Sequence, residues 1–548
     1  MDSEQFRIYG KQMIDYMVHY LNTIEERRVF PDVQPGYMKE LIPDAAPNEG
    51  EPWPSILSDV ERVIMPGLVH WQHPKFHAYF PAGNSFPSIM GDMLSSAIGC
   101  VGFSWASSPA CTELETICMD WFGKMLGLSS DFLTFSSTTG GGGCIQGSAS
   151  ECILTAFLSA RMKCLKKLRE EDPCQEDGFF LTKMVAYCSK QAHSAMEKAA
   201  SIVCVLLRQL PTDDNFSLRG QTLRNAIERD LEEGMIPIFV GATLGTTASC
   251  SFDNILELAA VCRKHDVWIH VDAAYAGSAL ICPEYRYIAE GLDLVDSVNV
   301  NVNKWLLINF DCSAFFVRNS QNVTDTFNAD PIYLRHKNAG SCIDYRHWGI
   351  PLSRRFRALK LWFVFRSYGI SGLQSYIRNH CKLAKKFKSH VIMDKRLELM
   401  GSVTLGLVCF RVKGLNKLSE KLLGSINESG KLHMIPSSLN GKYMIRFCVC
   451  AENSTVEDIE NSWDIIKEYV NKIIRPAEFN ENEIAEPCPT GEVVHVKKLA
   501  IKKIGPIPVD ADMVDIDEGV PFCSISELMI GRFKGRQRNL RSKSLQLW

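Results

Sequence analysis

The sequence lacks the segments that direct a chain into or across a membrane. Its first residues, MDSEQFRIYGKQM, are polar and do not show the basic and then apolar order of a secretory signal. The longest uncharged run, MIPIFVGATLGTTASCSF at 235–252, is interrupted by proline, glycine, serine and threonine. That run predicts a strand with its loop, not a membrane span. We therefore expect a cytoplasmic protein without a membrane partner.

The sequence also has little net charge and no metal-binding spacing of cysteine or histidine. Its formal net charge is −3, from 60 Lys and Arg against 63 Asp and Glu, so the bulk of the chain is not expected to bind nucleic acid. Its 20 cysteines form no CxxC pair and there is no HExxH, so we expect no metal site. In a long chain without a secretory signal, these cysteines are expected to be reduced thiols.

What the sequence does contain is an alternation of strand-like and helix-like segments between about 81 and 319. The strand-like segments are short and rich in Val, Ile and aromatic residues, which predicts a large α/β sheet with covering helices. The predicted strands lie at 184–189, 202–207, 236–245, 267–274, 297–302 and 313–318. The segment 148–170 predicts a helix with one apolar face, formed by Ile153, Ala156, Phe157 and Ala160.

The remaining segments suggest an arm, a second domain and a tail. The predicted organisation is an N-terminal helical arm at 1–80 with a helix at about 6–20, a large domain at 81–358 with a mobile loop at about 324–341, a small α/β domain at 359–475 with strands at 406–412 and 443–449, and a tail at 476–548. The tail ends in the basic stretch GRFKGRQRNLRSKSLQLW, which is typical of a solvated, flexible chain end.

A glycine-rich stretch, TTGGGGCIQGSASE at 138–151, precedes the predicted helix. The stretch has no Lys-Ser/Thr after its second glycine, which a P-loop needs, and no frame supplies the glycines of a dinucleotide fingerprint. What remains is a helix start at which Ser148, Ala149 and Ser150 bind one phosphate through the helix N-terminus. A plain loop with a serine N-cap fits this stretch equally well.

Two charged residues stand beside strongly apolar segments. Asp272 closes the strand in VWIHVDAAYAG, where it either faces a cation or protonated ring nitrogen or caps the following loop. Lys304 in NVNKWLLINFD follows the strand-like alternation at 298–301, and we expect it at that strand's end, where an unpaired ammonium is costly to bury. A lysine for covalent attachment, an aspartate for the pyridine nitrogen and a phosphate-binding helix start match the needs of pyridoxal phosphate.

Longer motifs carry a resemblance to a known family. They are IMPGLVHWQHPKFHAYFPAGNSFPSI, GFSWASSPACTELE, HVDAAYAGSA, NKWLLINFDCSA and DYRHWGIPLSRRFRALKLWFV. From about Phe6 to Ile474 the sequence resembles the group II pyridoxal-phosphate amino-acid decarboxylases, which include the aromatic amino-acid, histidine and tyrosine decarboxylases. The resemblance implies pyridoxal-phosphate fold type I (aspartate aminotransferase-like), with a large mixed-sheet cofactor domain, an N-terminal helical arm and a small C-terminal α/β domain. It also implies an obligate homodimer with two active sites at the subunit interface.

The resemblance assigns roles to individual residues. It makes Lys304 the lysine that attaches the cofactor and Asp272 the partner of the pyridine nitrogen. The other cofactor contacts that it implies are Ser148, Ala149, Ser150 and Asn301 at the phosphate, His193 stacked on the ring, Thr247 nearby and Ala274 against the other face. It makes Tyr333 the proton donor to Cα, on the mobile loop. From the residue pattern alone, His193 as a capping residue and Tyr333 as a packed aromatic fit equally well.

The resemblance also suggests a substrate. The pocket residues that it implies are Trp71, Tyr79, Phe80, Pro81, Ala82, Asn303 and Ser353, together with the partner subunit's Val101 and the partner subunit's Phe103. Asn303 is similar to the tyrosine decarboxylases and Ser353 to both the tyrosine and the histidine decarboxylases. Together they predict conversion of L-tyrosine to tyramine and CO2, with L-DOPA as a weaker substrate. The alternatives are a DOPA or general aromatic-amino-acid decarboxylase, a histidine decarboxylase, an aldehyde synthase, an aminotransferase and a catalytically silent homologue. Retention of both His193 and Tyr333 favours the amine over the aldehyde.

Overall fold

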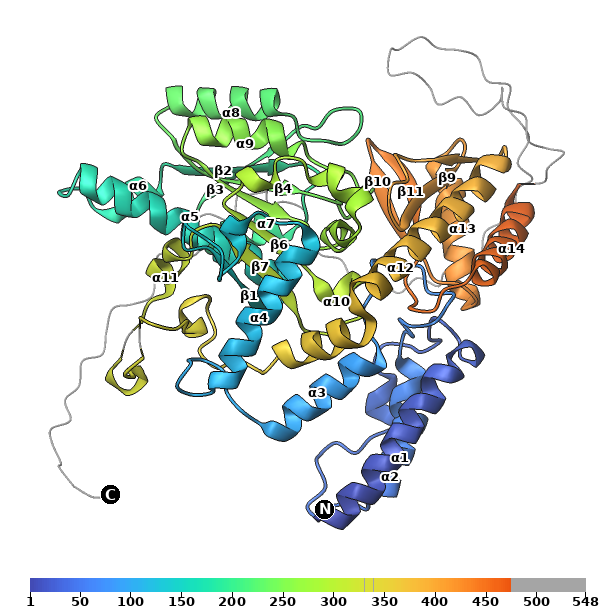
Figure 1. Ribbon diagram of the computed structural model, residues 1–548. Helices are drawn as coiled ribbons and strands as arrows, with labels where there is room; N and C mark the ends of the chain where they lie inside the picture. The colour runs from blue at the N-terminus through green and yellow to red at the C-terminus, as the bar shows by residue number, and fades with distance from the viewer. Residues whose placement is uncertain (330, 339, 475–548) are drawn as a thin grey trace, which may run out of the picture. The chain divides into compact units, whose positions relative to one another are not determined.

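The computed structural model describes residues 1–329, 331–338 and 340–474 (Figure 1). The tail predicted at 476–548 lies outside these described residues. Within the described part of the chain, no helix combines the length and apolar character needed to cross a membrane.

The described residues form helices and strands in an alternating order. The helices are α1 (Ser3–Asn22), α2 (Trp53–Asp59), α3 (Phe86–Ile98), α4 (Pro109–Leu126), α5 (Ala149–Glu171), α6 (Asp177–Leu181), α7 (Ala195–Ile202), α8 (Gly220–Glu232), α9 (Ile255–Lys264), α10 (Val302–Trp305), α11 (Gln321–Phe327), α12 (Ala358–Met393), α13 (Asn416–Ser429) and α14 (Val456–Ile473). The strands are β1 (Gly142–Gln146), β2 (Met184–Ser189), β3 (Leu206–Leu210), β4 (Ile236–Thr243), β5 (Trp268–Asp272), β6 (Ser297–Val300), β7 (Ser313–Val317), β8 (Leu397–Leu399), β9 (Leu407–Val412), β10 (Ile435–Leu439) and β11 (Lys442–Cys448).

A seven-stranded mixed sheet forms the larger layer. Its strand order is β1-β7-β6-β5-β4-β2-β3, in which β6, β5, β4, β2 and β3 run parallel and β7 pairs antiparallel with both β6 and β1. Its central strands are buried along their whole length, which explains why they read as continuous apolar runs. The carboxyl ends of parallel strands meet at one edge of a sheet, where ligands of α/β folds usually bind.

Helices cover both faces of this sheet. Along each strand, alternate side chains enter one of two apolar clusters. One cluster joins the sheet to α5 and α7, with Phe157 of α5 stacked on Phe239 of β4 at 4.3 Å. The other cluster joins the opposite face to α8 and α9. The predicted apolar face of α5, including Ile153 and Ala156, is fully buried as expected.

A second, antiparallel sheet has the order β10-β11-β9-β8. It packs with α13 and α14 around a third apolar cluster. Figure 1 shows α12 passing from α3 and α4 to this second sheet, in agreement with its contacts at both ends. The helix is interrupted at Gly369, whose φ of 62° and ψ of 177° are not helical.

Most predicted elements are confirmed. The N-terminal helix extends from Ser3 to Asn22, and Asp2 and Gln5 form a capping box at its start. The predicted strands at 184–189, 236–245, 267–274, 297–302 and 313–318 correspond to β2, β4, β5, β6 and β7, and those at 406–412 and 443–449 to β9 and β11.

Three local predictions are wrong. The strand predicted at 202–207 begins only at Leu206, because α7 continues to Ile202 and the chain turns at Cys204, whose φ is 56°. Part of the glycine run is a strand, β1, and not a loop. A Cβ at Gly143 would lie 2.7 Å from the Met119 methyl carbon, so only glycine allows this close packing. Lys304 does not end a strand: β6 stops at Val300, and Lys304 lies in the helical turn α10.

Candidate active site

A cavity of about 240 Å³ lies at the carboxyl ends of β4, β5 and β6, beside the start of α5. Its lining residues are Phe80, Ser148, Ala149, Ser150, Ile153, His193, Ala195, Thr243, Gly245, Thr247, Asp272, Ala274, Tyr275, Asn301 and Lys304. This set contains all nine residues predicted to contact the cofactor, although they come from segments as far apart as 148 and 304. The structure therefore brings the predicted cofactor residues together.

One end of the cavity is formed by the N-terminus of α5. Ser148 is the N-cap residue, and its hydroxyl accepts a hydrogen bond from the Glu151 N–H. Ser148 and Ser150 are exposed on the cavity side of a 23-residue helix, which offers an anion its unpaired N–H groups and the positive end of the helix dipole. This end suits a phosphate group.

Asp272 is the last residue of β5 and is buried. Its Oδ1 accepts hydrogen bonds from the Ala274 N–H and from Nδ2 of Asn299, both at 3.1 Å. Both bonds end on the same oxygen, so Oδ2 remains for a group in the cavity. Asp272 therefore does cap the following loop, as one alternative from the sequence suggests, but this contact uses only one of its two oxygens.

Lys304 reaches the cavity from α10. Its Nζ lies 5.6 Å from the centre of the Phe80 ring. Burial lowers the pKa of Lys304, the carboxylate of Asp272 opposes this shift, and the guanidinium of Arg446 adds to it. A lowered pKa makes the neutral amine more accessible near neutral pH, which is what a nucleophilic lysine needs.

His193 lines the cavity between β2 and α7. Its Nδ1 accepts a hydrogen bond from the Ala195 N–H at 3.1 Å, which leaves the proton of the neutral ring on Nε2. Burial lowers the pKa of His193, and Lys304 lowers it further against the opposing effect of Asp272. The ring is thus neutral at physiological pH. His193 therefore makes the capping contact that the residue pattern suggests and also lines the cavity.

A stack of three aromatic rings lies under the cavity. Phe80 stacks on Tyr275 at 3.9 Å, and Tyr275 stacks on Trp305 at 4.7 Å, with interplanar angles of 18° in both cases. The guanidinium of Arg446 lies 5.0 Å from the centre of the Phe80 ring. Its Nη2 donates to the Tyr79 carbonyl, whereas Nε and Nη1 are buried and have no hydrogen-bond partner within the described residues. Our sequence reasoning missed Arg446, because a single arginine in a strand carries no motif.

The residues predicted for the substrate lie in several places. Of these residues, Phe80 lines the cavity. Trp71 and Tyr79 stack on each other at 5.1 Å and are 37% and 47% exposed, so both present free ring surface. Pro81 is buried beside them, and the Ala82 carbonyl accepts a hydrogen bond from Gln72 Nε2.

Asn303 and Ser353, on which the tyrosine prediction rested, differ in exposure. Asn303 is 1% exposed and is not among the cavity-lining residues; its Oδ1 accepts from the Cys312 N–H and thereby braces the loop after α10. Its Nδ2 has no hydrogen-bond partner among the described residues. Ser353 is exposed.

The residues predicted to act from a partner subunit or a mobile loop also lie outside this cavity. Val101 is exposed and Phe103 is half-buried. Tyr333 lies in the predicted loop and is 77% exposed. In this conformation the single chain provides a cofactor-sized cavity without these three side chains.

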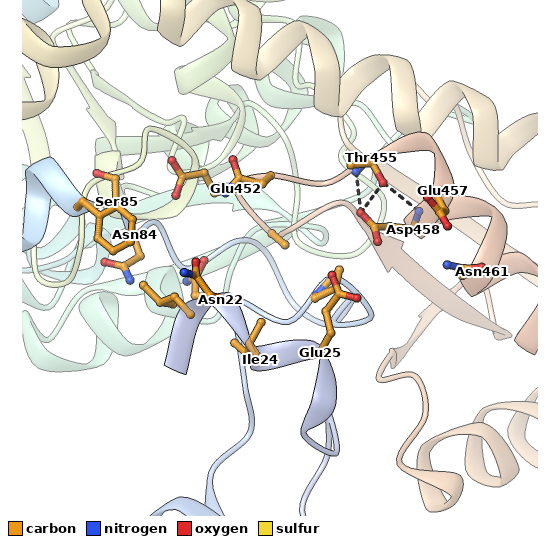
Figure 2. Close-up of a pocket in the computed structure, with 16 residues that line it drawn as sticks. Asn22, Ile24, Glu25, Asn84, Ser85, Glu452, Thr455, Glu457, Asp458 and Asn461 are labelled. Atoms are coloured by element: carbon orange, nitrogen blue, oxygen red, sulfur yellow. Dashed lines mark hydrogen bonds between the residues drawn. The ribbon is translucent and has the colours of Figure 1, made fainter. Parts of the chain in front are cut away.

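A larger cavity, of about 410 Å³, lies between the N-terminal segment, the 84–86 turn and the start of α14 (Figure 2). None of the predicted site residues lines it. Its ionisable groups are the carboxylates of Glu25, Glu452, Glu457 and Asp458. Figure 2 shows that Asp458 is already bonded to Thr455, in the capping box of α14. The residues that line this larger cavity offer no amine, thiol or imidazole for catalysis, so it is a weaker candidate for the active site than the cavity at Lys304.

Among the described residues, His336, Cys342 and Asp344 offer potential metal-ligand atoms within 4.8 Å of one another. Asp344 Oδ2 already pairs with His336 Nε2 at 2.9 Å, and its Oδ1 accepts from the Trp105 N–H. These contacts account for the cluster without a cation.

Comparisons with known proteins identify the family. Residues 35–413 match the model of the pyridoxal-dependent decarboxylase conserved domain. The chain belongs to this family. It is 53% identical to histidine decarboxylase of Drosophila melanogaster over 86% of its length, although that match spans only 56% of the fly enzyme. It is 51% identical to aromatic-L-amino-acid decarboxylase of Rattus norvegicus, over 87% of this chain and 99% of the rat enzyme.

A solved structure confirms the fold. TDC from Oryza sativa, solved with PLP and tryptamine, matches with a TM-score of 0.83 and 32% identity, over 86% of this chain and 99% of the rice chain. The predicted fold type I is therefore confirmed, the chain is a decarboxylase, and pyridoxal phosphate is its cofactor.

The cavity itself fits this cofactor. Besides the α5 N-terminus, Asp272 and Lys304, its lining residues include three with a buried polar atom that has no hydrogen-bond partner in the described structure, namely Thr243 Oγ1, Tyr275 Oη and Asn301 Oδ1. Buried polar atoms of this kind are normally satisfied, so their position on the cavity wall indicates a polar occupant.

Proposed function

We propose that the protein decarboxylates L-tyrosine to tyramine and CO2, and that L-DOPA is a second substrate. The observation that carries the proposal is the aromatic surface beside the cofactor cavity. Phe80 forms part of the cavity wall, and the adjacent Trp71 and Tyr79 are stacked and exposed, so a flat ring can pack against them. The decarboxylases with similar sequences are named for aromatic amino acids and for histidine, which supports a ring-bearing substrate.

The choice of tyrosine rests on Asn303, which resembles the tyrosine decarboxylases, and on Ser353, which resembles the tyrosine and the histidine decarboxylases. Ser353 is exposed and offers a hydroxyl to a phenol oxygen. Asn303 is buried against the loop 303–312, so we assign it an indirect role in shaping the pocket floor.

We assign the cofactor contacts as follows. Ser148, Ala149 and Ser150 at the α5 N-terminus hold the phosphate together with Asn301, and Lys304 attaches the cofactor covalently. Asp272, whose Oδ2 has no partner among the described residues, would pair with the protonated ring nitrogen. His193, Thr247 and Ala274, which also line the cavity, would hold the ring. When bound, pyridoxal phosphate accepts the electron pair released from the bond between Cα and the carboxylate.

The chain's own residues then control the proton steps. The lowered pKa of Lys304 makes its neutral amine more accessible, and burial lowers the pKa of His193, which disfavours a positive charge beside the ring. Tyr333 is the proposed proton donor to Cα. Since it is 77% exposed, the loop that carries it has to close over the substrate. We propose that this occurs in a homodimer, in which the partner subunit's Phe103 completes the pocket.

A competition experiment tests the substrate. The purified protein, supplied with pyridoxal phosphate, is given equal concentrations of L-tyrosine, L-DOPA, L-tryptophan and L-histidine, and all products are identified by mass. Tyramine as the main product supports the proposal, and a dominant dopamine or tryptamine signal contradicts the tyrosine assignment. The matched variant Tyr333→Phe is expected to form less amine, and release of aldehyde and hydrogen peroxide would show that the loop tyrosine controls the fate of Cα.

Histidine is the second candidate substrate. It is favoured by the 53% identity to the fly histidine decarboxylase, which slightly exceeds the identity to the rat enzyme. The same competition decides between them, because histamine as the main product would replace our proposal by this one.

A further inference from the structure

A row of polar side chains crosses the face of the large sheet that packs against α5. Trp268, His270 and Asp272 alternate along β5, and Ser297 and Asn299 alternate along β6. The strands pair in register, with His270 opposite Ser297 and Asp272 opposite Asn299. All five side chains are at most 5% exposed. Of these five residues, only Asp272 lines the cofactor cavity.

Hydrogen bonds connect the five side chains into one chain. Nε1 of Trp268 donates to Ser297 Oγ at 2.9 Å, and Ser297 Oγ lies 2.8 Å from His270 Nδ1. On the other side of the imidazole, Nε2 lies 2.8 Å from Asn299 Oδ1, and Asn299 Nδ2 donates to Asp272 Oδ1 at 3.1 Å.

Only one arrangement of protons satisfies this chain. The carboxylate of Asp272 can only accept, so Asn299 presents its NH2 group to Asp272 and its oxygen to His270. Nε2 of His270 has to carry the proton, because an unprotonated nitrogen would face an oxygen. Nδ1 then accepts the hydroxyl proton of Ser297, whose oxygen receives the indole N–H. Burial lowers the pKa of His270 to about 4, so the neutral ring that this arrangement requires is present at physiological pH.

We infer that Asn299 and His270 are positioning residues that orient the carboxylate of Asp272 toward the pyridine nitrogen of the cofactor. Every bond in the chain points its donor toward Asp272, and the series ends on Oδ1. The other oxygen, Oδ2, is left for the ring nitrogen. The inference rests on the proposed pairing of Asp272 with that nitrogen, and it adds two residues that do not touch the cavity.

Packing alone does not explain why His270 and Asn299 are buried in this layer. His270 lies between the rings of Phe239 and Phe315, at 6.2 and 6.1 Å, in an otherwise apolar layer under α5. Burying an imidazole and an amide there costs free energy that apolar side chains would not cost. A linear, fully satisfied series of hydrogen bonds that ends on Oδ1 of Asp272 has a direct use, because it holds that carboxylate in one orientation.

The test measures the protonation of the cofactor ring in the holoenzyme without substrate. Each variant is loaded with pyridoxal phosphate labelled with 15N in the ring, and the 15N chemical shift distinguishes a protonated from a neutral pyridine. Asn299→Leu removes the donor to Asp272 and keeps the branching and the number of non-hydrogen atoms of the side chain. His270→Phe removes the imidazole, and His270→Gln restores one acceptor and one donor in the same order. The matched control is His77→Phe, which removes another buried imidazole with two hydrogen bonds, to the Cys448 carbonyl and Ser462 Oγ.

We expect the wild-type ring to be protonated. In Asn299→Leu the proton moves toward Asp272, so the 15N shift moves toward the neutral value and the ratio of the charged to the neutral pair falls about tenfold or more, as loss of a hydrogen bond to a charged group predicts. The affinity of the apoenzyme for pyridoxal phosphate, measured by fluorescence quenching, falls about tenfold with it. His270→Phe shows a smaller shift in the same direction, whereas His270→Gln and His77→Phe keep the wild-type value.

Two results would overturn the inference. One is an unchanged 15N shift in both Asn299→Leu and His270→Phe. The other is a shift in His77→Phe as large as that in His270→Phe, which would indicate general loosening of the core. If Asn299→Leu does not fold, the pair His270→Phe and His270→Gln decides. A wrong substrate assignment does not affect these readouts, because no amino acid is present, and an unprotonated wild-type ring would contradict the role of Asp272 itself.

Discussion

The buried ion pair between Glu115 and Arg354 allows us to predict how much a substitution lowers the free energy of unfolding. Both side chains are nearly buried, at 2% and 9% exposure, and two hydrogen bonds of 2.6 and 2.9 Å join them. Glu115 also accepts from the Ile145 N–H in β1, and Arg354 donates to the Ile145 carbonyl. The pair therefore fixes the strand that leads into the α5 N-terminus. Because Glu115→Gln leaves a buried guanidinium without its counter-charge, we expect a loss of about 3–5 kcal/mol in the free energy of unfolding.

A surface pair of the same geometry provides the control. Arg378 and Glu284 are joined by hydrogen bonds of 2.6 and 2.9 Å, but their side chains are 45% and 46% exposed. Water screens this pair, so Glu284→Gln should cost at most about 1 kcal/mol. The assay is urea unfolding of the cofactor-loaded protein, followed by tryptophan fluorescence. Equal midpoints for the two variants would refute the reasoning, because burial is the property that separates the pairs.

Three further predictions follow from single positions. Gly143→Ala should destabilise the protein by about 1–3 kcal/mol, because the new Cβ would lie 2.7 Å from the Met119 methyl, whereas Gly178→Ala meets open space and should leave the melting temperature nearly unchanged. Burial lowers the pKa of His77 to about 3 in the folded protein. The stability that the neutral ring contributes is therefore present above pH 6.5 and is lost as the pH falls, because the unfolded chain then binds a proton that the folded protein does not. In denaturant titrations between pH 6.5 and 5, His77→Phe should reduce the increase in the free energy of unfolding with pH by up to about 1.4 kcal/mol per pH unit. Ser353→Gly should shift the ratio of kcat/KM values from tyrosine toward tryptophan by about tenfold, and an unchanged ratio would remove Ser353 from the specificity argument.

Asp272 and the helix start at Ser148 could be singled out from the sequence because each is part of a local signal, whereas the proposed roles of the other cofactor residues, such as His193, are implied by the resemblance alone. A charged residue beside an apolar strand, as at Asp272, is visible in a few neighbouring residues. The glycine-rich stretch before Ser148 is likewise visible within a few neighbouring residues. Asn299 and His270 carry no such signal, since their contact with Asp272 depends on the register of β5 against β6. Arg446 is equally hidden, because it comes from the second sheet and reaches Phe80 only through tertiary packing.

The errors in the fold prediction have a common cause. Glycine is unfavourable in strands by propensity, so β1 was predicted as a loop, although Gly143 lies in a strand where Met119 and Phe316 leave no room for a side chain. The alternation around Val298 suggested that the strand continued to Lys304, but the chain enters a helical turn after Val300. In both cases close tertiary contacts determined the backbone, and these contacts involve residues distant in the sequence.

The charged residues around the cavity act together on the amine of Lys304. Lys304 and Arg446 both lie over the Phe80 ring, and Asp272 is the carboxylate that faces them. Burial and the guanidinium of Arg446 lower the pKa of Lys304, and the carboxylate of Asp272 opposes this shift. The proposed role of Lys304, covalent attachment of the cofactor, needs the neutral amine, which a lowered pKa makes more accessible. The residues that act on Lys304 come from both sheets, since Asp272 ends β5 and Arg446 lies in β11.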